Sequence, residues 1–169
     1  MMGIIRVLAL MNLLACFAVN PALAESDHSQ HSHDTSGFEL GMSLGQVDLG
    51  EEEGAGPGLH VHLGRRLGHH GIAEMVSIGV GGEWIFTEEK HYSLMLPVSI
   101  HPRRGLALAV APGFLWAEHE GHMEREYSTH LEAAYLFELG QFDLGPAFGY
   151  SKTADEDHTM IGVHLGWHW

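Results

Sequence analysis

Histidine is the residue type in this chain with the most capacity for chemistry, because it occupies 15 of 169 positions. Neutral imidazole, together with carboxylate, is the ligand set of zinc and related divalent transition metals. Two His groups lie in polar sequence, and short His-rich tracts of this kind indicate metal binding by composition. The candidate ligands there are His28, His31 and His33 in the segment 25–36, and His119 and His122 in the acidic segment 118–126.

Neither of these segments has the fixed spacing of a closed zinc site. The run His-Glu-Gly-His at 119–122 also differs from the helical His-Glu-x-x-His of metalloproteases. A solvated linker at 25–36 and a plain solvated loop at 118–126 therefore remain alternatives to metal capture.

A third set of His residues lies in alternating sequence. His60 and His62 are two positions apart, as are His130 and Glu132. Residues i and i+2 of an extended strand share one face, so each pair would present its side chains together. We expect His60, His62 and His130 to be candidate ligands for zinc, copper or nickel. The alternative is that these residues are polar filler, side chains that only occupy the interior, since His and carboxylate groups can satisfy each other's hydrogen bonds without a metal.

Period-two alternation of apolar and polar residues runs through the chain from Gly37 onward, and amphipathic helical periodicity is hard to find. The alternation predicts eight strands, most of them longer than the ~5–6 residues typical of soluble sheets. Their length is close to the ~9–11 residues that a tilted strand needs to cross a bilayer. The expected strands are 38–46, 58–66, 73–86, 91–101, 105–117, 127–139, 142–151 and 158–169.

The two faces of the expected strands differ in kind. One carries large apolar side chains, with aromatics near both strand ends, whereas the other carries Gly, Ala, Ser, His and Glu. A large apolar face with aromatic girdles is typical of a lipid-facing barrel surface, and the small polar face suits a narrow lumen. The ionisable residues predicted to face the lumen are His60, His62, Glu83, His91, His101, His130, Glu132, Glu138, Asp143, His158, His164 and His168.

The connections between the expected strands alternate in length. Residues 67–71, 102–104 and 140–141 are expected to be short turns at the end that carries both termini. Longer acidic loops, including 118–126, are expected at the other end. This asymmetry is typical of bacterial outer-membrane barrels, whose longer loops point away from the cell.

Residues 1–24 have the features of a secretory signal peptide. Arg6 supplies the positive charge, Val7 to Val19 is apolar, and 22–24 is an Ala-Leu-Ala cleavage site. Residues 25–36 then form a polar, His-rich tail, which we expect to be disordered and periplasmic. Lipidation at Cys16, within a Leu-Leu-Ala-Cys run, is the alternative to cleavage at 24. The excess of 22 acidic over 8 basic residues excludes nucleic acid as a partner.

Residues 37–169 resemble the small eight-stranded outer-membrane β-barrels of the OmpA/OmpX-like type. The last strand ends in Val-His-Leu-Gly-Trp-His-Trp at 163–169, similar to the terminal aromatic signal of that group. The resemblance implies an all-β, antiparallel up-and-down transmembrane barrel in the bacterial outer membrane. It also implies contact with outer-membrane lipid, delivery to the barrel-assembly machinery through the last strand, and a monomer. Three prolines depart from the pattern and are expected to mark bulges: Pro97, Pro112 and Pro146.

An eight-stranded barrel has an interior just wide enough for side chains to fill, which argues against an open diffusion pore. We expect a non-enzymatic protein with a structural or binding role, and divalent metal binding through the His-rich segments as its sharper form. One alternative is a lipid-A-modifying enzyme using Ser128, His130 and Glu132, or Ser93 with His91. Parallel side chains on one strand do not by themselves make a converging triad. A narrow passive transport barrel is the other alternative.

Overall fold

The computed structural model describes residues 37–169, except 51–53, 88, 104, 120 and 155. The predicted signal peptide, the polar tail and the ligands His28, His31 and His33 lie outside the described residues. Within the described part, no helix is long and apolar enough to cross a membrane. The strands are β1 (Phe38–Asp48), β2 (Ala55–Arg66), β3 (Val76–Phe86), β4 (Lys90–Met95), β5 (Val98–Arg103), β6 (Leu106–His119), β7 (His122–Tyr135), β8 (Phe137–Leu139), β9 (Phe142–Lys152) and β10 (Asp157–His168).

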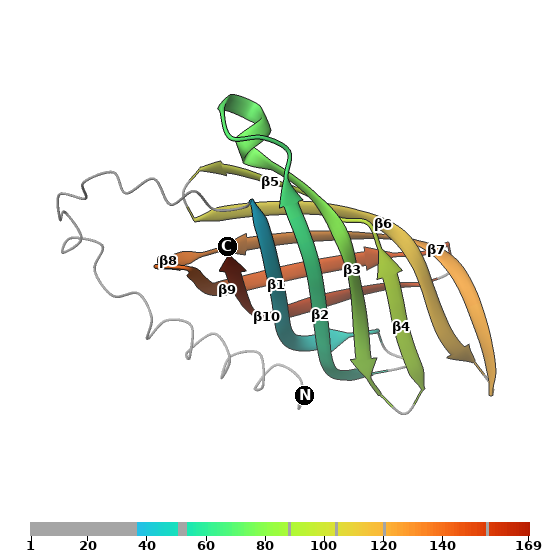
Figure 1. Cartoon of the computed structure of the whole chain (residues 1–169). Helices are drawn as coiled ribbons and strands as arrows, with labels where there is room; N and C mark the ends of the chain where they lie inside the picture. Colours follow the sequence, from blue (N-terminus) through green and yellow to red (C-terminus); the bar gives the residue numbers. More distant parts are fainter. Residues whose placement is uncertain (1–36, 51–53, 88, 104, 120, 155) are drawn as a thin grey trace. The chain divides into compact units, whose positions relative to one another are not determined.

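All strand pairs are antiparallel, and β10 pairs with both β9 and β1, so the sheet closes on itself. Figure 1 shows the strands side by side around the barrel, with β10 next to β1. The ten strands make eight spans, because β4 with β5 and β7 with β8 each form one interrupted span. The predicted fold class, a closed antiparallel eight-stranded barrel, is confirmed.

The three prolines do not shift the register of their spans, and only Pro97 lies at a break between strands. The span predicted at 91–101 breaks at Leu96 and Pro97, yet Met95 and Val98 keep one continuous register against β3 and β6. Pro112 lies inside β6 opposite Thr129, and Pro146 lies inside β9 opposite Val163. The expectation of bulges at these prolines is therefore wrong. Proline lacks an N–H, but its carbonyl oxygen can still accept a hydrogen bond. The Leu96 N–H donates to the Pro112 carbonyl over 2.9 Å.

The connections differ from the expected ones at two places. Strand β3 begins at Val76 instead of residue 73, because residues Gly71–Met75 form a short 3-10 helix. The connection 67–75 is therefore longer than the short turn expected at that end of the barrel. The segment 118–126 is not a loop, because β6 continues to His119 and β7 starts at His122. Gly121 lies in the tight turn between them. Its φ of 80° is a backbone conformation that other residues rarely adopt.

The alternating faces are arranged as predicted. Large apolar side chains such as Leu44 (59% exposed) and Val163 (52% exposed) point outward. Aromatic rings lie on this outer surface near both strand ends. Tyr92 stacks with Trp116 at one end, and Phe142 stacks with Trp167 at the other. A continuous apolar belt with aromatic rims fits a lipid environment, since water would oppose its exposure.

The lumen is filled by the small and polar face. Every ionisable residue expected to point inward is buried or half-buried, with one exception. Glu138 is exposed, because it lies in the short rim strand β8, beyond Leu136, the last inward-facing residue of that span. The barrel core is thus built largely from Ser, His and carboxylate side chains, and its organisation decides what the protein can bind.

Candidate metal centre in the barrel lumen

Four strands bring a set of inward-facing polar side chains together near the middle of the lumen. Strand register places His60 and His164 on either side of Ser43, one from β2 and one from β10. Strand β7 contributes His130 and Glu132 from across the barrel. We call Ser43, His60, His130, Glu132 and His164 the central cluster; all five are buried.

The Glu132 carboxylate is the hub of the central cluster. Its Oε2 accepts a hydrogen bond from His60 Nδ1 over 2.7 Å, and lies 3.8 Å from His130 Nε2. Its Oε1 accepts from the Ser43 hydroxyl over 3.2 Å and lies 3.2 Å from His164 Nδ1. Ser43 Oγ and His164 Nδ1 are themselves 2.9 Å apart. One carboxylate therefore faces three imidazoles in a site removed from water, where it favours a positive charge.

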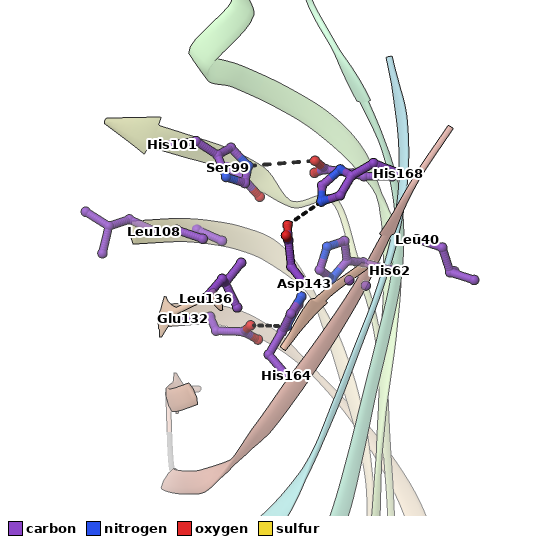
Figure 2. Close-up of a pocket in the computed structure, with 15 residues that line it drawn as sticks. Leu40, His62, Ser99, His101, Leu108, Glu132, Leu136, Asp143, His164 and His168 are labelled. Atoms are coloured by element: carbon purple, nitrogen blue, oxygen red, sulfur yellow. Dashed lines mark hydrogen bonds and ion pairs between the residues drawn. The ribbon is translucent and has the colours of Figure 1, made fainter. Parts of the chain in front are cut away.

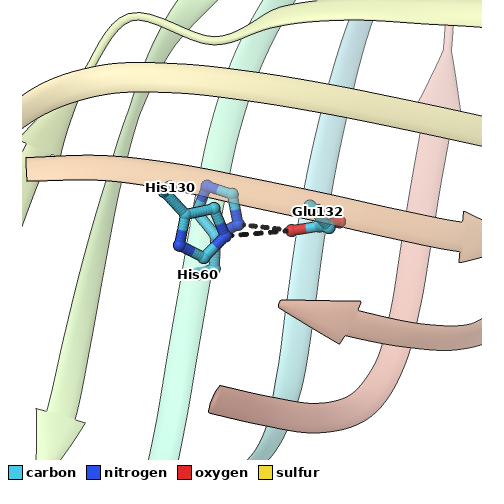
Figure 3. Close-up of side chains that lie close together, drawn as sticks. All are labelled: His60, His130 and Glu132. Carbon is cyan, nitrogen blue, oxygen red and sulfur yellow. Dashed lines mark hydrogen bonds and ion pairs between the residues drawn. The ribbon is translucent and has the colours of Figure 1, made fainter. Parts of the chain in front are cut away.

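Three members of the central cluster are placed to share a metal ion. One ligand atom from each of His60, His130 and Glu132 lies within 4.8 Å of the other two (Figure 3). Two imidazoles and one carboxylate form a donor set that zinc accepts, with a further position left for water or another ligand. Buried polar atoms are normally paired, yet both ring nitrogens of His130 and Nε2 of His60 have no hydrogen-bond partner. The residues present thus fit a divalent transition metal.

His62 lies beside the central cluster without joining the three-ligand group. Its ring centroid is 5.5 Å from that of His60 and 5.7 Å from that of His164. Gly41 on β1 makes room for it, because a Cβ at position 41 would overlap the His62 ring. The expected i, i+2 pairing of His60 and His62 on one face is therefore present, but only His60 is placed with two other ligands.

Two further groups of polar side chains flank the central cluster. Toward the end where β1 begins and β10 ends, His101 Nε2 is 3.7 Å from Glu39, and His168 pairs with Asp143. We call Glu39, His101, Asp143 and His168 the vestibule; Figure 2 labels the last three. Toward the other end, His158 Nε2 lies 3.2 Å from Glu83 in a fully enclosed pair.

Among the described side chains, the remaining sequence candidates form no further group of three ligands. His119 and His122 face each other in the register at the end of the β6–β7 hairpin, and the His122 side chain is exposed. Ser128, His130 and Glu132 all project from β7 into the lumen, where they are buried. Ser93 and His91 on β4 are buried in the same way.

Sequence reasoning placed Glu132 and His164 in the lumen but did not include them among the ligands, and it missed Ser43. A usable signal existed for Glu132, which shares a strand face with His130. For Ser43 and His164 the decisive information is the β1–β10 register, which a single strand does not contain.

No protein-family model matches the chain, and no curated protein matches it. Solved structures do match its fold. Neisserial surface protein A aligns with a TM-score of 0.59 and 11% identity, over 80% of this chain and 99% of that one. The N-terminal β-barrel domain of Pseudomonas aeruginosa OprF aligns with a TM-score of 0.55 and 12% identity, over 80% and 99%. The fold is that of a small outer-membrane β-barrel.

A structure from the de novo design of transmembrane β-barrels also aligns, with a TM-score of 0.50 and 12% identity, over 79% of this chain and 96% of that one. At such identities the likeness concerns the fold alone. It confirms the resemblance seen in the sequence and, with the apolar belt, supports the outer-membrane localisation. What this barrel does must be argued from its own lumen.

Proposed function

We propose that the protein is a non-enzymatic outer-membrane barrel that binds a divalent transition metal ion in its lumen. His60, His130 and Glu132 are the proposed ligands. The observation that carries the proposal is their convergence in a buried site, with ligand atoms within 4.8 Å of one another and three imidazole nitrogens without a hydrogen-bond partner.

Polar side chains that only fill space would explain part of the lumen, but they do not explain the group of His60, His130 and Glu132. Filler requires that buried polar groups satisfy one another. Asp143 with His168 and Glu83 with His158 form hydrogen-bonded pairs, in which only one atom of each pair, His168 Nδ1 or Glu83 Oε1, lacks a hydrogen-bond partner. His130 is less satisfied still, since neither of its ring nitrogens has a hydrogen-bond partner while the residue is 2% exposed. A bound cation would satisfy it and would neutralise Glu132.

The His-rich segments outside the lumen are proposed as secondary capture sites. His28, His31 and His33 lie within six residues of one another in the predicted tail, next to Asp27 and Asp34. His119 and His122 are register partners at a hairpin end whose strands also carry Glu118 and Glu124. Both segments supply the ligand types that divalent transition metals accept.

The lipid-A-modifying alternative has less support. Its Ser, His and Glu candidates on β7 are enclosed in the lumen, and His130 lies beside His60 and Glu132 instead of activating a serine. We further propose that residues 1–24 direct secretion, that the barrel is a monomer, and that the barrel-assembly machinery reads its last strand. Trp169 supports the last point, because it packs on Trp167 and Phe38 at the closing seam.

The test is metal titration of the purified barrel by calorimetry and by the visible spectrum of Co²⁺. Wild-type protein should bind zinc and Co²⁺ in the lumen, and His130→Ala or Glu132→Gln should weaken that binding by about a hundredfold or more. His70→Ala is the matched control, because His70 is exposed on the 67–75 connection. Heat-modifiable gel mobility checks that each variant is folded. Undiminished binding in both lumen variants would refute the proposed site.

A further inference from the structure

The inward-facing residues of β1 and β10 change character along the barrel axis. We call the end where β1 begins and β10 ends the terminal end. From there, the inward-facing residues of each strand change from an ionisable residue, to a member of the central cluster, to an apolar residue. On β1 the sequence of inward residues is Glu39, Gly41, Ser43, Gly45 and Val47. On β10 it is His168, Gly166, His164, Gly162 and Met160.

At the end of the lumen opposite the terminal end, the described inward-facing side chains are buried, and an apolar cluster lies among them. Val47, Ile85 and Met160 form one buried cluster, and Val47 and Met160 have no exposed surface. We call these three residues the outer plug. The adjacent Glu83 side chain is 1% exposed, and its partner His158 is 4% exposed. A hydrated cation crossing this region would have to lose its water against apolar side chains, which is strongly unfavourable.

The terminal end is open to water by comparison. The side chains of His101, His168 and Asp143 in the vestibule are 24%, 21% and 13% exposed. A cavity there has about 30 Å³ of room for water, which corresponds to roughly two water molecules. Its walls include the vestibule and also His62, His164 and Glu132, so the cavity reaches the central cluster (Figure 2).

We propose that the vestibule is the entrance to the metal site, and that divalent metal ions exchange with the central cluster from the terminal end alone. This inference rests on the proposed function. Glu39 and Asp143 attract cations, and His101 and His168 offer transient imidazole ligands on the way in. In an outer-membrane barrel whose termini face the periplasm, the lumen is then a dead-end site loaded from the periplasm, and it does not conduct metal across the membrane.

The first test blocks the entrance reversibly without touching a ligand. Ser99 lines the cavity, and Ser99→Cys in a Cys16→Ser background supplies the only thiol. A benzyl methanethiosulfonate adduct on that thiol would fill the cavity, and dithiothreitol would remove it. We expect the adduct to slow Co²⁺ association, followed by stopped-flow absorbance, by about tenfold or more, and reduction to restore the rate. Ala154→Cys, exposed at the opposite end, is the matched control and should bind at the wild-type rate with or without the adduct.

The second test does not depend on the proposed metal site. Ser43→Cys in the central cluster and Val47→Cys in the outer plug are each made in the Cys16→Ser background. Each folded barrel is exposed to silver ion, and the thiol left is titrated after denaturation. Ser43→Cys should lose its thiol about tenfold faster, because it lies on the vestibule side of the outer plug.

The two tests separate the two ideas. If Co²⁺ gives no spectrum with any unmodified protein, the proposed function fails, while the silver rates still decide whether the entrance exists. If Co²⁺ binds and the Ser99→Cys adduct leaves its rate unchanged, the entrance is overturned. Equal silver rates at positions 43 and 47 would overturn it independently.

Discussion

The lipid-facing surface and the lumen are built from alternating residues of the same strands, yet they obey different rules. The outer surface is a belt of aliphatic side chains such as Leu44 and Val163 with aromatic rims, where apolar character is sufficient. The lumen depends on pairs and triples at defined distances, such as His60 with Glu132 at 2.7 Å. The comparison teaches that the outer face specifies where the barrel resides and the inner face specifies what it binds.

The largest effect on folding is expected in the lumen. Glu132→Ala removes the carboxylate that His60, His164 and Ser43 contact, and leaves those groups buried without their partner. The loss should lower the free energy of unfolding by about 3–5 kcal/mol. Urea unfolding in detergent with a metal chelator measures it. Ser128→Ala, an inward change on the same strand outside the central cluster, is the control. A stability equal to that of the control would show that the lumen pairs are interchangeable filler.

The next effect should appear on the outer face. Leu44→Arg places a charge near the middle of β1 in the lipid belt, at a cost of about 2–4 kcal/mol. Leu44→Val should change stability little, because it keeps the surface apolar. Unfolding in phospholipid vesicles compares the two. If Leu44→Arg is as stable as Leu44→Val, the outward face does not contact lipid.

Much of this comparison was accessible from sequence, because period-two alternation assigns each residue to a face whatever its partner strand. The faces of all eight spans and eleven of the twelve lumen residues follow from it. The break at Leu96 and Pro97 and the exposure of Glu138 depend on where pairing ends, which alternation does not encode. The polar residues 118–126 predict a loop, whereas β6 and β7 stay paired as far as His119 and His122, because polar residues can pair in a strand that extends beyond the apolar belt.

The candidate site was less accessible than the fold. Sequence could place His60, His130 and Glu132 on inward faces, because each assignment concerns one strand. Whether they meet depends on the relative height of β2 and β7 across the barrel, which is set by the registers of all the strands between them. A single sequence contains no direct measure of that stagger.

A smaller effect should follow from filling the space beside His62. Gly41→Ala adds a methyl group that would overlap the His62 ring and lie 2.9 Å from His164 Cε1. We expect a loss of about 1–3 kcal/mol in stability and weaker metal binding, since the rings must shift. Gly166→Ala is the matched control: Gly166 is the β10 partner of Gly41, and a Cβ there meets no atom closer than 3.4 Å. Equal behaviour of the two variants would show that the lumen packing is loose.

The smallest effect on folding is expected from the tail. Replacing His28, His31 and His33 together by Ala should leave barrel stability unchanged. It should remove a metal-binding component whose affinity falls between about pH 7 and 5.5, because imidazole with an ordinary pKa near ~6.5 must lose its proton to bind metal. Calorimetry across that pH range measures the change. Identical binding curves before and after the replacement would exclude the tail as a capture site.

The most direct measurement of the central claim is zinc X-ray absorption on the barrel that carries these three tail replacements. A lumen site formed by His60, His130 and Glu132 predicts imidazole scattering from two ligands and an oxygen ligand, all at about 2.0–2.2 Å. Converting His130 to Ala in that protein should remove one imidazole. A spectrum with oxygen ligands only, or one that His130→Ala leaves unchanged, would contradict the account.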